Sequence, residues 1–124
     1  MTEIERMPGQ SPMVPGAIRA GGFVFTSGTV ADVSGSALPI EEQASGALNA
    51  LLDSLTQFGC TPADVVRLEA FLADADDFAA WNQAFLMVWP QPGPTRTTLV
   101  CSFALPGILI EVQAIAVVPD RNRC

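Results

Sequence analysis

The sequence contains no histidine, no lysine and no tyrosine, and all six of its basic residues are arginine. These absences exclude a histidine general base, a lysine Schiff base, the lysine of a phosphate-binding P-loop and a histidine-ligated metal site. The three cysteines are widely spaced and lack any CxxC pair, which favours reduced thiols over a zinc site or a disulfide framework. If the protein is an enzyme, its proton transfers fall to a carboxylate, a cysteine, a backbone group or water.

Charge is also scarce. Charged residues make up 15% and hydrophobic residues 49% of the 124 residues, so we expect apolar surface to be buried in an oligomer; the alternative is a tightly packed monomer. The net charge of −7 argues against nucleic acid or anionic lipid as the main partner, because phosphate binding needs clustered basic residues. No apolar run approaches the roughly 20 residues of a membrane span, and the N-terminal segment lacks the pattern of a signal peptide. We therefore predict a cytoplasmic protein that does not engage membranes.

The periodicity of apolar residues predicts a single α+β domain with helices on one face of one sheet. Residues 1–16 are predicted as an irregular arm and residues 119–124 as a loose tail. Between them we expect a hairpin over 17–28 with its turn at Gly21 and Gly22, a loop over 32–38, a helix over 39–58, a strand over 65–72, a helix from 74 to before Pro90, and two strands around Arg96 and Glu111. The acidic residues at 74–77 are explained by helix capping rather than by a metal.

Arg96 and Glu111 are the two charges within the last two apolar, β-prone runs, and burying a charge is costly unless it is paired. Arg96 stands beside two threonines, which suits a carboxylate-binding site, since a guanidinium can grip a carboxylate with two hydrogen bonds. The alternative is a structural ion pair with Glu111 or another neighbour, and composition alone does not decide between them. Strand alternation places Glu111 and Gln113 on the face directed away from the helices.

Two further residues have more than one interpretation. Gly28 follows Ser27 at the end of a strand, and it either allows a close approach of the backbone to a ligand or simply ends the strand. Cys101 is expected on the face of its strand opposite Arg96, where packing is favoured over reactivity.

Four segments carry a resemblance to a known family: residues 20–28 (AGGFVFTSG), 76–82 (DDFAAWN), 94–100 (PTRTTLV) and 105–117 (LPGILIEVQAIAV). In their order and spacing they resemble the RidA (YjgF-type) family of enamine and imine deaminases. The resemblance implies a chorismate-mutase-like α+β fold with two helices packed on one face of a mixed sheet. It also implies a homotrimer with clefts between subunits, without metal or organic cofactor. The last two strands, which we would otherwise pair as a hairpin, are then separated by another strand.

The same resemblance implies a reaction and roles for particular residues. The substrate would be a reactive enamine or imine carboxylate, such as 2-aminoacrylate, hydrolysed to the oxo acid and ammonia. Arg96 would bind the carboxylate and Glu111 would hold or activate the attacking water. The pocket would further include Ser27, Gly28, Asn82 and Thr98. The alternatives are a non-catalytic, carboxylate-binding or regulatory trimer and a different pathway-specific reaction in the same cleft, because a fold does not determine function.

The sequence departs from the family pattern at the expected pocket. Met13 or Val14 occupies the region of a common pocket tyrosine, Thr98 stands where many members have cysteine, and Gln113 where many have a second glutamate. A more apolar entrance favours a larger or aromatic-derived imine, which we treat as a hypothesis.

Overall fold

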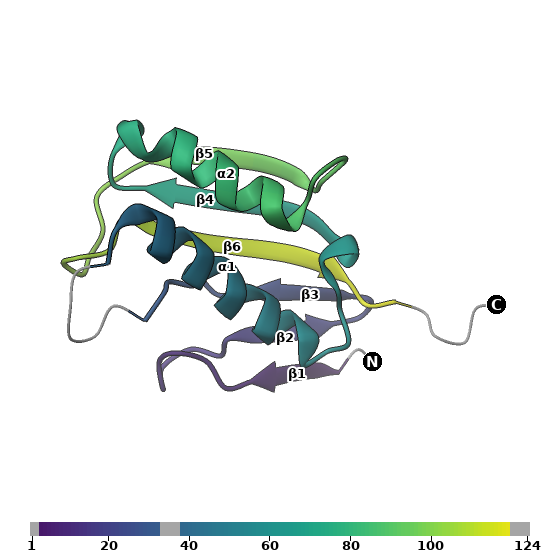
Figure 1. The fold of residues 1–124 in the computed structure, drawn as a ribbon. Coiled ribbons are helices and arrows are strands. Elements are labelled where there is room, and N and C mark those ends of the chain that lie inside the picture. The colour runs from purple at the N-terminus through teal and green to yellow at the C-terminus, as the bar shows by residue number, and fades with distance from the viewer. Residues whose placement is uncertain (1–2, 33–37, 120–124) are drawn as a thin grey trace.

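The computed structural model describes residues 3–32 and 38–119. Two helices cover a single face of one sheet, and no helix of the described residues lies on the other face (Figure 1). Residues 33–37 of the expected loop and residues 120–124 of the expected tail lie outside the described residues.

The elements follow one another as a hairpin with an additional edge strand, a helix, a strand, a second helix and two strands. They are β1 (Ile4–Met7), β2 (Ala17–Ala20), β3 (Phe23–Thr26), α1 (Ile40–Thr56), β4 (Val65–Leu72), α2 (Phe78–Val88), β5 (Thr95–Val100) and β6 (Ile110–Val117). Short 3-10 turns, Pro62–Asp64 and Ala75–Asp77, precede β4 and α2.

The strand order of the six-stranded sheet is β1-β2-β3-β6-β4-β5. Every neighbouring pair is antiparallel except β4 and β5, which are parallel, so the sheet is mixed. The predicted α+β class with both helices on one face is confirmed. Because β4 lies between β5 and β6, a direct hairpin of the last two strands is wrong, and the order implied by the family resemblance is correct.

The expected irregular arm contains a strand. β1 pairs with β2, with Ile4 opposite Ala20 and Met7 opposite Ala17. Three of its four residues are exposed and the fourth is half-buried, so the strand is held by main-chain hydrogen bonds and not by burial. An exposed edge strand of this kind has no alternating apolar pattern, which explains why the sequence did not indicate it.

α1 follows its sequence signals. Pro39 stands at the N-cap, two glutamates lie in the first turn, and the helix ends at Thr56 shortly before Gly59, whose φ is +79°. The buried stripe of the helix consists of Gln43, Ala44, Ala47, Leu48, Leu51 and Leu55. The one polar member of the stripe is bonded: the Gln43 amide donates to the carbonyls of Leu38 and Gly107 and accepts from the N–H of Leu109. Gln43 therefore ties α1 to the loop between β5 and β6.

β4 departs from strict alternation at its start. Strict alternation with the buried Leu68 and Ala70 would place Val66 in the core, but Val66 is 43% exposed and Val65 is buried instead. A β-bulge between Val65 and Arg67 shifts the register of β4 against β6, and it reverses the side to which these first residues point.

β6 alternates as predicted. Its even-numbered positions from 110 to 116 are buried under the helices, whereas Glu111, Gln113 and Ile115 are half-buried on the open face. The open face also carries large apolar side chains that are at least one third exposed: Phe23, Phe25, Leu99 and Val117. The fold therefore presents Glu111 on a partly apolar face that no helix covers.

Candidate active site

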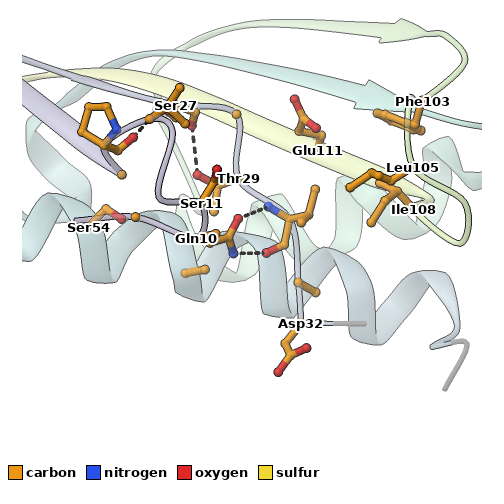
Figure 2. Close-up of a pocket in the computed structure, with 18 of the residues that line it drawn as sticks. Gln10, Ser11, Ser27, Thr29, Asp32, Ser54, Phe103, Leu105, Ile108 and Glu111 are labelled. Atoms are coloured by element: carbon orange, nitrogen blue, oxygen red, sulfur yellow. Dashed lines mark hydrogen bonds between the residues drawn. The ribbon is translucent and has the colours of Figure 1, made fainter. Parts of the chain in front are cut away.

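A cavity of about 880 Å³ opens beside Glu111. Figure 2 shows its lining residues arranged around a central space, with Glu111 projecting from β6. The lining comes from residues 8–11, 14–16, 27–32 and 103–105 together with Ala50, Ser54, Ile108 and Glu111. The cavity is thus formed by the N-terminal loop, the segment after β3, α1 and the β5–β6 loop.

Gly28 lies directly against the Glu111 carboxylate. An isolated bridge pairs Thr29 with Val112, with hydrogen bonds of 2.7 and 2.9 Å, and so holds the segment after β3 alongside β6 at this position. A Cβ atom at position 28 would overlap Oε2 of Glu111 and lie 2.8 Å from its Cδ. The absence of a side chain at Gly28 therefore makes room for the carboxylate, which is more than the end of a strand requires.

The polar side chains near Gly28 hold the cavity wall together. Ser27 Oγ donates to the Pro15 carbonyl at 2.6 Å, and Thr29 Oγ1 donates to the Ser27 carbonyl at 2.9 Å. The Gln10 amide donates to the Val30 carbonyl at 2.6 Å and accepts from the Val30 N–H at 3.3 Å. Figure 2 shows these contacts on one side of the cavity. Ser27 was predicted from the family resemblance, whereas Gln10 was missed because a single glutamine in a Pro- and Gly-rich segment has no pattern.

Arg96 lies outside this cavity: it belongs to β5, and its side chain packs between β5 and α2. Its position on β5 pairs with Leu68 of β4, a buried residue of the helix-covered face, so the Arg96 side chain points toward the helices. The guanidinium carbon is 4.7 Å from the ring centroid of Phe85, 5.8 Å from that of Phe78 and 5.9 Å from that of Trp81. Cation–π contacts with three aromatic rings orient the guanidinium and offset part of the cost of burying its charge.

Thr98 and Asn82 belong to the same cluster. Trp81 Nε1 donates to Thr98 Oγ1 at 3.1 Å, which places Thr98 under α2. Asn82 precedes Phe85 by three residues, which makes the two side chains neighbours on α2. Its buried Oδ1 has no hydrogen-bond partner in the described part of the chain. A buried acceptor without a donor is costly, and it marks a place where a ligand or a second molecule can donate.

The predicted site residues therefore form two groups, which one chain does not bring together. Arg96 pairs with Leu68, and Glu111 pairs with Phe71, three residues further along β4. Positions three apart on a strand point to opposite faces, so Arg96 and Glu111 lie on opposite faces of the sheet. The interpretation as an ion pair between them is wrong. Arg96 contacts aromatic rings, and the Glu111 carboxylate has no hydrogen bond or ion pair within residues 3–32 and 38–119.

Cys101 is exposed, contrary to the expected packing. It follows the end of β5, where its N–H donates to the Leu72 carbonyl at 2.9 Å. β5 is the edge strand of the sheet, and the residues at its end, Leu99, Val100 and Cys101, are exposed. Strand alternation indicated the side to which Cys101 points but could not show that this end of the sheet lies at the surface.

The acidic segment before α2 acts as a helix cap. Asp74 Oδ1 accepts from the N–H of Asp76 at 2.8 Å, as predicted. The pKa of Asp77 is raised, first by desolvation and then by the neighbouring carboxylates of Asp74, Glu41 and Asp76. Across the described ranges, no group of three or more His, Cys, Asp or Glu side chains is arranged to hold a metal ion. No helix found there has the length and apolar character required to cross a membrane.

Comparison with known proteins adds one family match and several close structural similarities. A family model described as Endoribonuclease L-PSP matches residues 4–118. Protein mmf2, mitochondrial, from Schizosaccharomyces pombe is 34% identical over 105 residues, which are 81% of this chain and 83% of the relative.

Two solved structures share the fold. A Neisseria meningitidis member of the YjgF protein family superposes with a TM-score of 0.86 at 25% identity, covering 95% of this chain and 97% of the other. A Mycobacterium tuberculosis member of the YjgF/YER057c/UK114 family has a TM-score of 0.84 at 24% identity, covering 94% and 100%. The similarity therefore spans nearly the whole chain in each case.

Proposed function

Because the chain belongs to the YjgF/YER057c/UK114 family, also called RidA, we propose that it hydrolyses a reactive enamine or imine carboxylate to an oxo acid and ammonia. The observation that carries the proposal is the position of Glu111. Its carboxylate stands in a large cavity, against a glycine that leaves room for it, with no protein partner within the described residues. A carboxylate so placed is available to hold a water molecule.

The chemistry needs only one such group, because an imine carbon is already electrophilic. An enamine first tautomerises to the imine. Glu111 then accepts a proton from water, the water oxygen bonds to the imine carbon, and the π electrons of the C=N bond move to nitrogen. The proton held by Glu111 passes to the nitrogen and gives a carbinolamine, which carries a hydroxyl and an amino group on the same carbon. Glu111 then moves the hydroxyl proton to the amino nitrogen, the electrons of the O–H bond form the C=O bond, and the C–N bond breaks, which releases ammonia and leaves the oxo acid. Orientation of the imine against the bound water supplies much of the acceleration.

Arg96 would anchor the substrate carboxylate, and it would do so from a second copy of the chain. The described residues that line the cavity include no arginine, and Arg96 lies on the opposite face of the sheet from Glu111. A homotrimer whose clefts join the α2–β5 side of one subunit to the Glu111 cavity of the next would complete the site. The exposed apolar side chains of the open face, including Phe23 and Phe25, support such an association. Asn82, a neighbour of Phe85 on α2, would contribute to the same cleft.

The family description names an endoribonuclease, but this chain lacks the charge that RNA binding requires. It has 13 acidic residues against six arginines, for a net charge of −7. Phosphate contacts depend on clustered Lys and Arg, and the cavity is lined by acidic rather than basic charges. We therefore propose no RNA cleavage. The predicted location of this chain is the cytoplasm, whereas the relative mmf2 is named as a mitochondrial protein.

The test is ammonia release from imines generated in place by an amino-acid oxidase. We expect Glu111→Gln to slow imine hydrolysis by roughly 10²–10⁴-fold, the usual contribution of a positioned acid or base. We expect Arg96→Ala to slow it by about 10²-fold through loss of orientation. Glu42→Gln on α1 and Arg6→Ala on β1 alter exposed residues outside both groups and serve as matched controls.

Normal rates in both Glu111→Gln and Arg96→Ala would refute the catalytic proposal. Tight binding of 2-oxo acids without any turnover of imines would favour the regulatory, carboxylate-binding alternative instead.

A further inference from the structure

We infer that the imine handled by this protein carries a bulky apolar side group, seated against an apolar wall formed by Phe103, Leu105 and Ile108. The inference rests on the proposed function, because it assigns a substrate class to the same site. It identifies the β5–β6 loop, from which all three residues come, as the specificity element.

The wall stands next to Glu111. Figure 2 shows Phe103, Leu105 and Ile108 gathered on one side of the cavity, beside the Glu111 carboxylate and opposite the Ser27 side. Ile108 is 8% exposed and Leu105 is 68% exposed, so the wall extends from the buried floor of the cavity to its rim. A side group bonded to the carbon that water attacks beside Glu111 would fall against this wall.

The wall is held in place by a buried contact. Gln43, which is 1% exposed, donates to the Gly107 carbonyl at 2.9 Å and accepts from the Leu109 N–H at 2.9 Å. These two bonds flank Ile108 on both sides. A preformed apolar surface binds an apolar group with little ordering cost, so the wall is suited to select rather than merely to tolerate such a group.

The cavity offers few polar contacts to a substrate side chain. The side chains of Gln10, Ser27 and Thr29 are already bonded to the backbone of the cavity's own segments. Among the described residues of the lining, the charged ones are Asp32 and Glu111, both acidic, so no described charge of the lining attracts an anionic side group. Asp32 points away from the apolar wall in Figure 2. An apolar side group is the type that this lining accommodates.

The size of the cavity supports the same conclusion. At about 880 Å³ it lies near the upper end of the ~300–1,000 Å³ typical of ligand pockets. A three-carbon imine would leave most of it filled with water. The sequence had suggested an apolar entrance at Met13 or Val14; Val14 does line the cavity, whereas Met13 lies only in the neighbouring groove of the N-terminal loop. The apolar wall is a separate feature, on the other side of the cavity.

The experiment compares imines generated from alanine, leucine, phenylalanine, glutamate and ornithine. Each buried methylene is expected to raise kcat/KM about fourfold, so the leucine-derived imine should exceed the alanine-derived one by at least about tenfold. Phe103→Ala and Leu105→Ala should each reduce the ratio of kcat/KM for the leucine-derived imine to that for the alanine-derived imine by about fivefold. Phe103→Leu, which keeps the wall apolar, should retain most of the preference.

Ile4→Ala is the matched control, because Ile4 is an exposed aliphatic residue of β1 that neither lines the cavity nor lies on the α2–β5 side. Melting temperatures of all variants check that they fold. Equal turnover of alanine- and leucine-derived imines, or a preference for the glutamate- or ornithine-derived one, would overturn the inference and leave the proposed function intact.

Absence of turnover with every imine would instead contradict the proposed function. The substrate class is then decided by calorimetric binding of the corresponding oxo acids. Binding of 4-methyl-2-oxopentanoate at least about tenfold tighter than pyruvate, weakened in Leu105→Ala, supports the apolar wall. Equal binding of the two acids, or no binding of either, overturns it.

Discussion

Mixing two inactive variants should restore activity if the site is shared between subunits. Arg96→Ala removes the proposed carboxylate anchor and leaves Glu111 intact, whereas Glu111→Gln removes the proposed water-holding carboxylate and leaves Arg96 intact. Because the two residues lie on opposite faces of the sheet, one subunit cannot supply both to the same site. Mixed oligomers would contain some clefts with an intact Arg96 from one subunit and an intact Glu111 from its neighbour.

The size of the recovery follows from the geometry. In randomly mixed closed rings with equal amounts of both variants, each cleft has one chance in two of an intact arginine and one in two of an intact glutamate. Roughly a quarter of the clefts are then complete, so about 25% of the wild-type rate is expected. If f is the fraction of one variant, the recovery follows f(1 − f) and is symmetric about equal mixing. A site built within one subunit would give no recovery at any ratio.

The assay is ammonia release after the two variants are unfolded together and refolded, or are co-expressed. Native mass spectrometry of differently tagged subunits verifies that mixed oligomers form. Each variant refolded alone provides the background rate. Mixed oligomers without recovered activity would refute a shared site, and so would a wild-type protein that is active as a monomer.

Three further predictions concern single residues. Gly28→Ala should displace the Glu111 carboxylate, which is the flexible neighbour nearest to the added Cβ. We expect imine hydrolysis to fall at least about tenfold with little change in melting temperature. Unchanged activity would show that the close approach of Gly28 to Glu111 has no function. Gln43→Leu should destabilise the protein by roughly 1–3 kcal/mol for each buried group left unbonded, measured by urea unfolding against Gln83→Leu on the exposed side of α2. Burial and nearby carboxylates raise the pKa of Asp77, so the ionised Asp77 carboxylate destabilises the folded protein at a pH above that pKa. Asp77→Asn should therefore raise the melting temperature at pH 7. The gain should disappear below pH 3.8, the ordinary pKa of an aspartate, where Asp77 is protonated in both the folded and the unfolded protein. A gain that is independent of pH would contradict this reasoning.

Several parts of the fold were predictable because their residues carry local signals. The stripe of α1, the Asp74 cap and the turn at Gly21 each depend on neighbours within a few positions, and each was found where expected. The alternation of β6 likewise predicted that Glu111 faces away from the helices.

Other features depend on contacts between distant segments and had no local signal. β1 is held by main-chain bonds at an exposed edge, and the amides of Gln10 and Gln43 bond to backbone groups 20 and 64 residues away. The bulge at Val66 and the exposure of Cys101 also follow from neighbouring strands rather than from their own sequence. The family resemblance supplied the position of β4 between β5 and β6, which periodicity did not.

The sequence by itself determined which residues could do chemistry. With no histidine, lysine or tyrosine, Arg96 and Glu111 stood out as charges in apolar strands, and the resemblance assigned them to one site. Only the tertiary structure decided how these two residues are related. Alternation along one strand shows only that its residues point to two opposite faces. The register of β4 against β5 and β6 decides which residues of β5 and of β6 share a face of the sheet. That register places the two charges on opposite sides of the sheet, which is why the proposed function takes Arg96 from a second subunit.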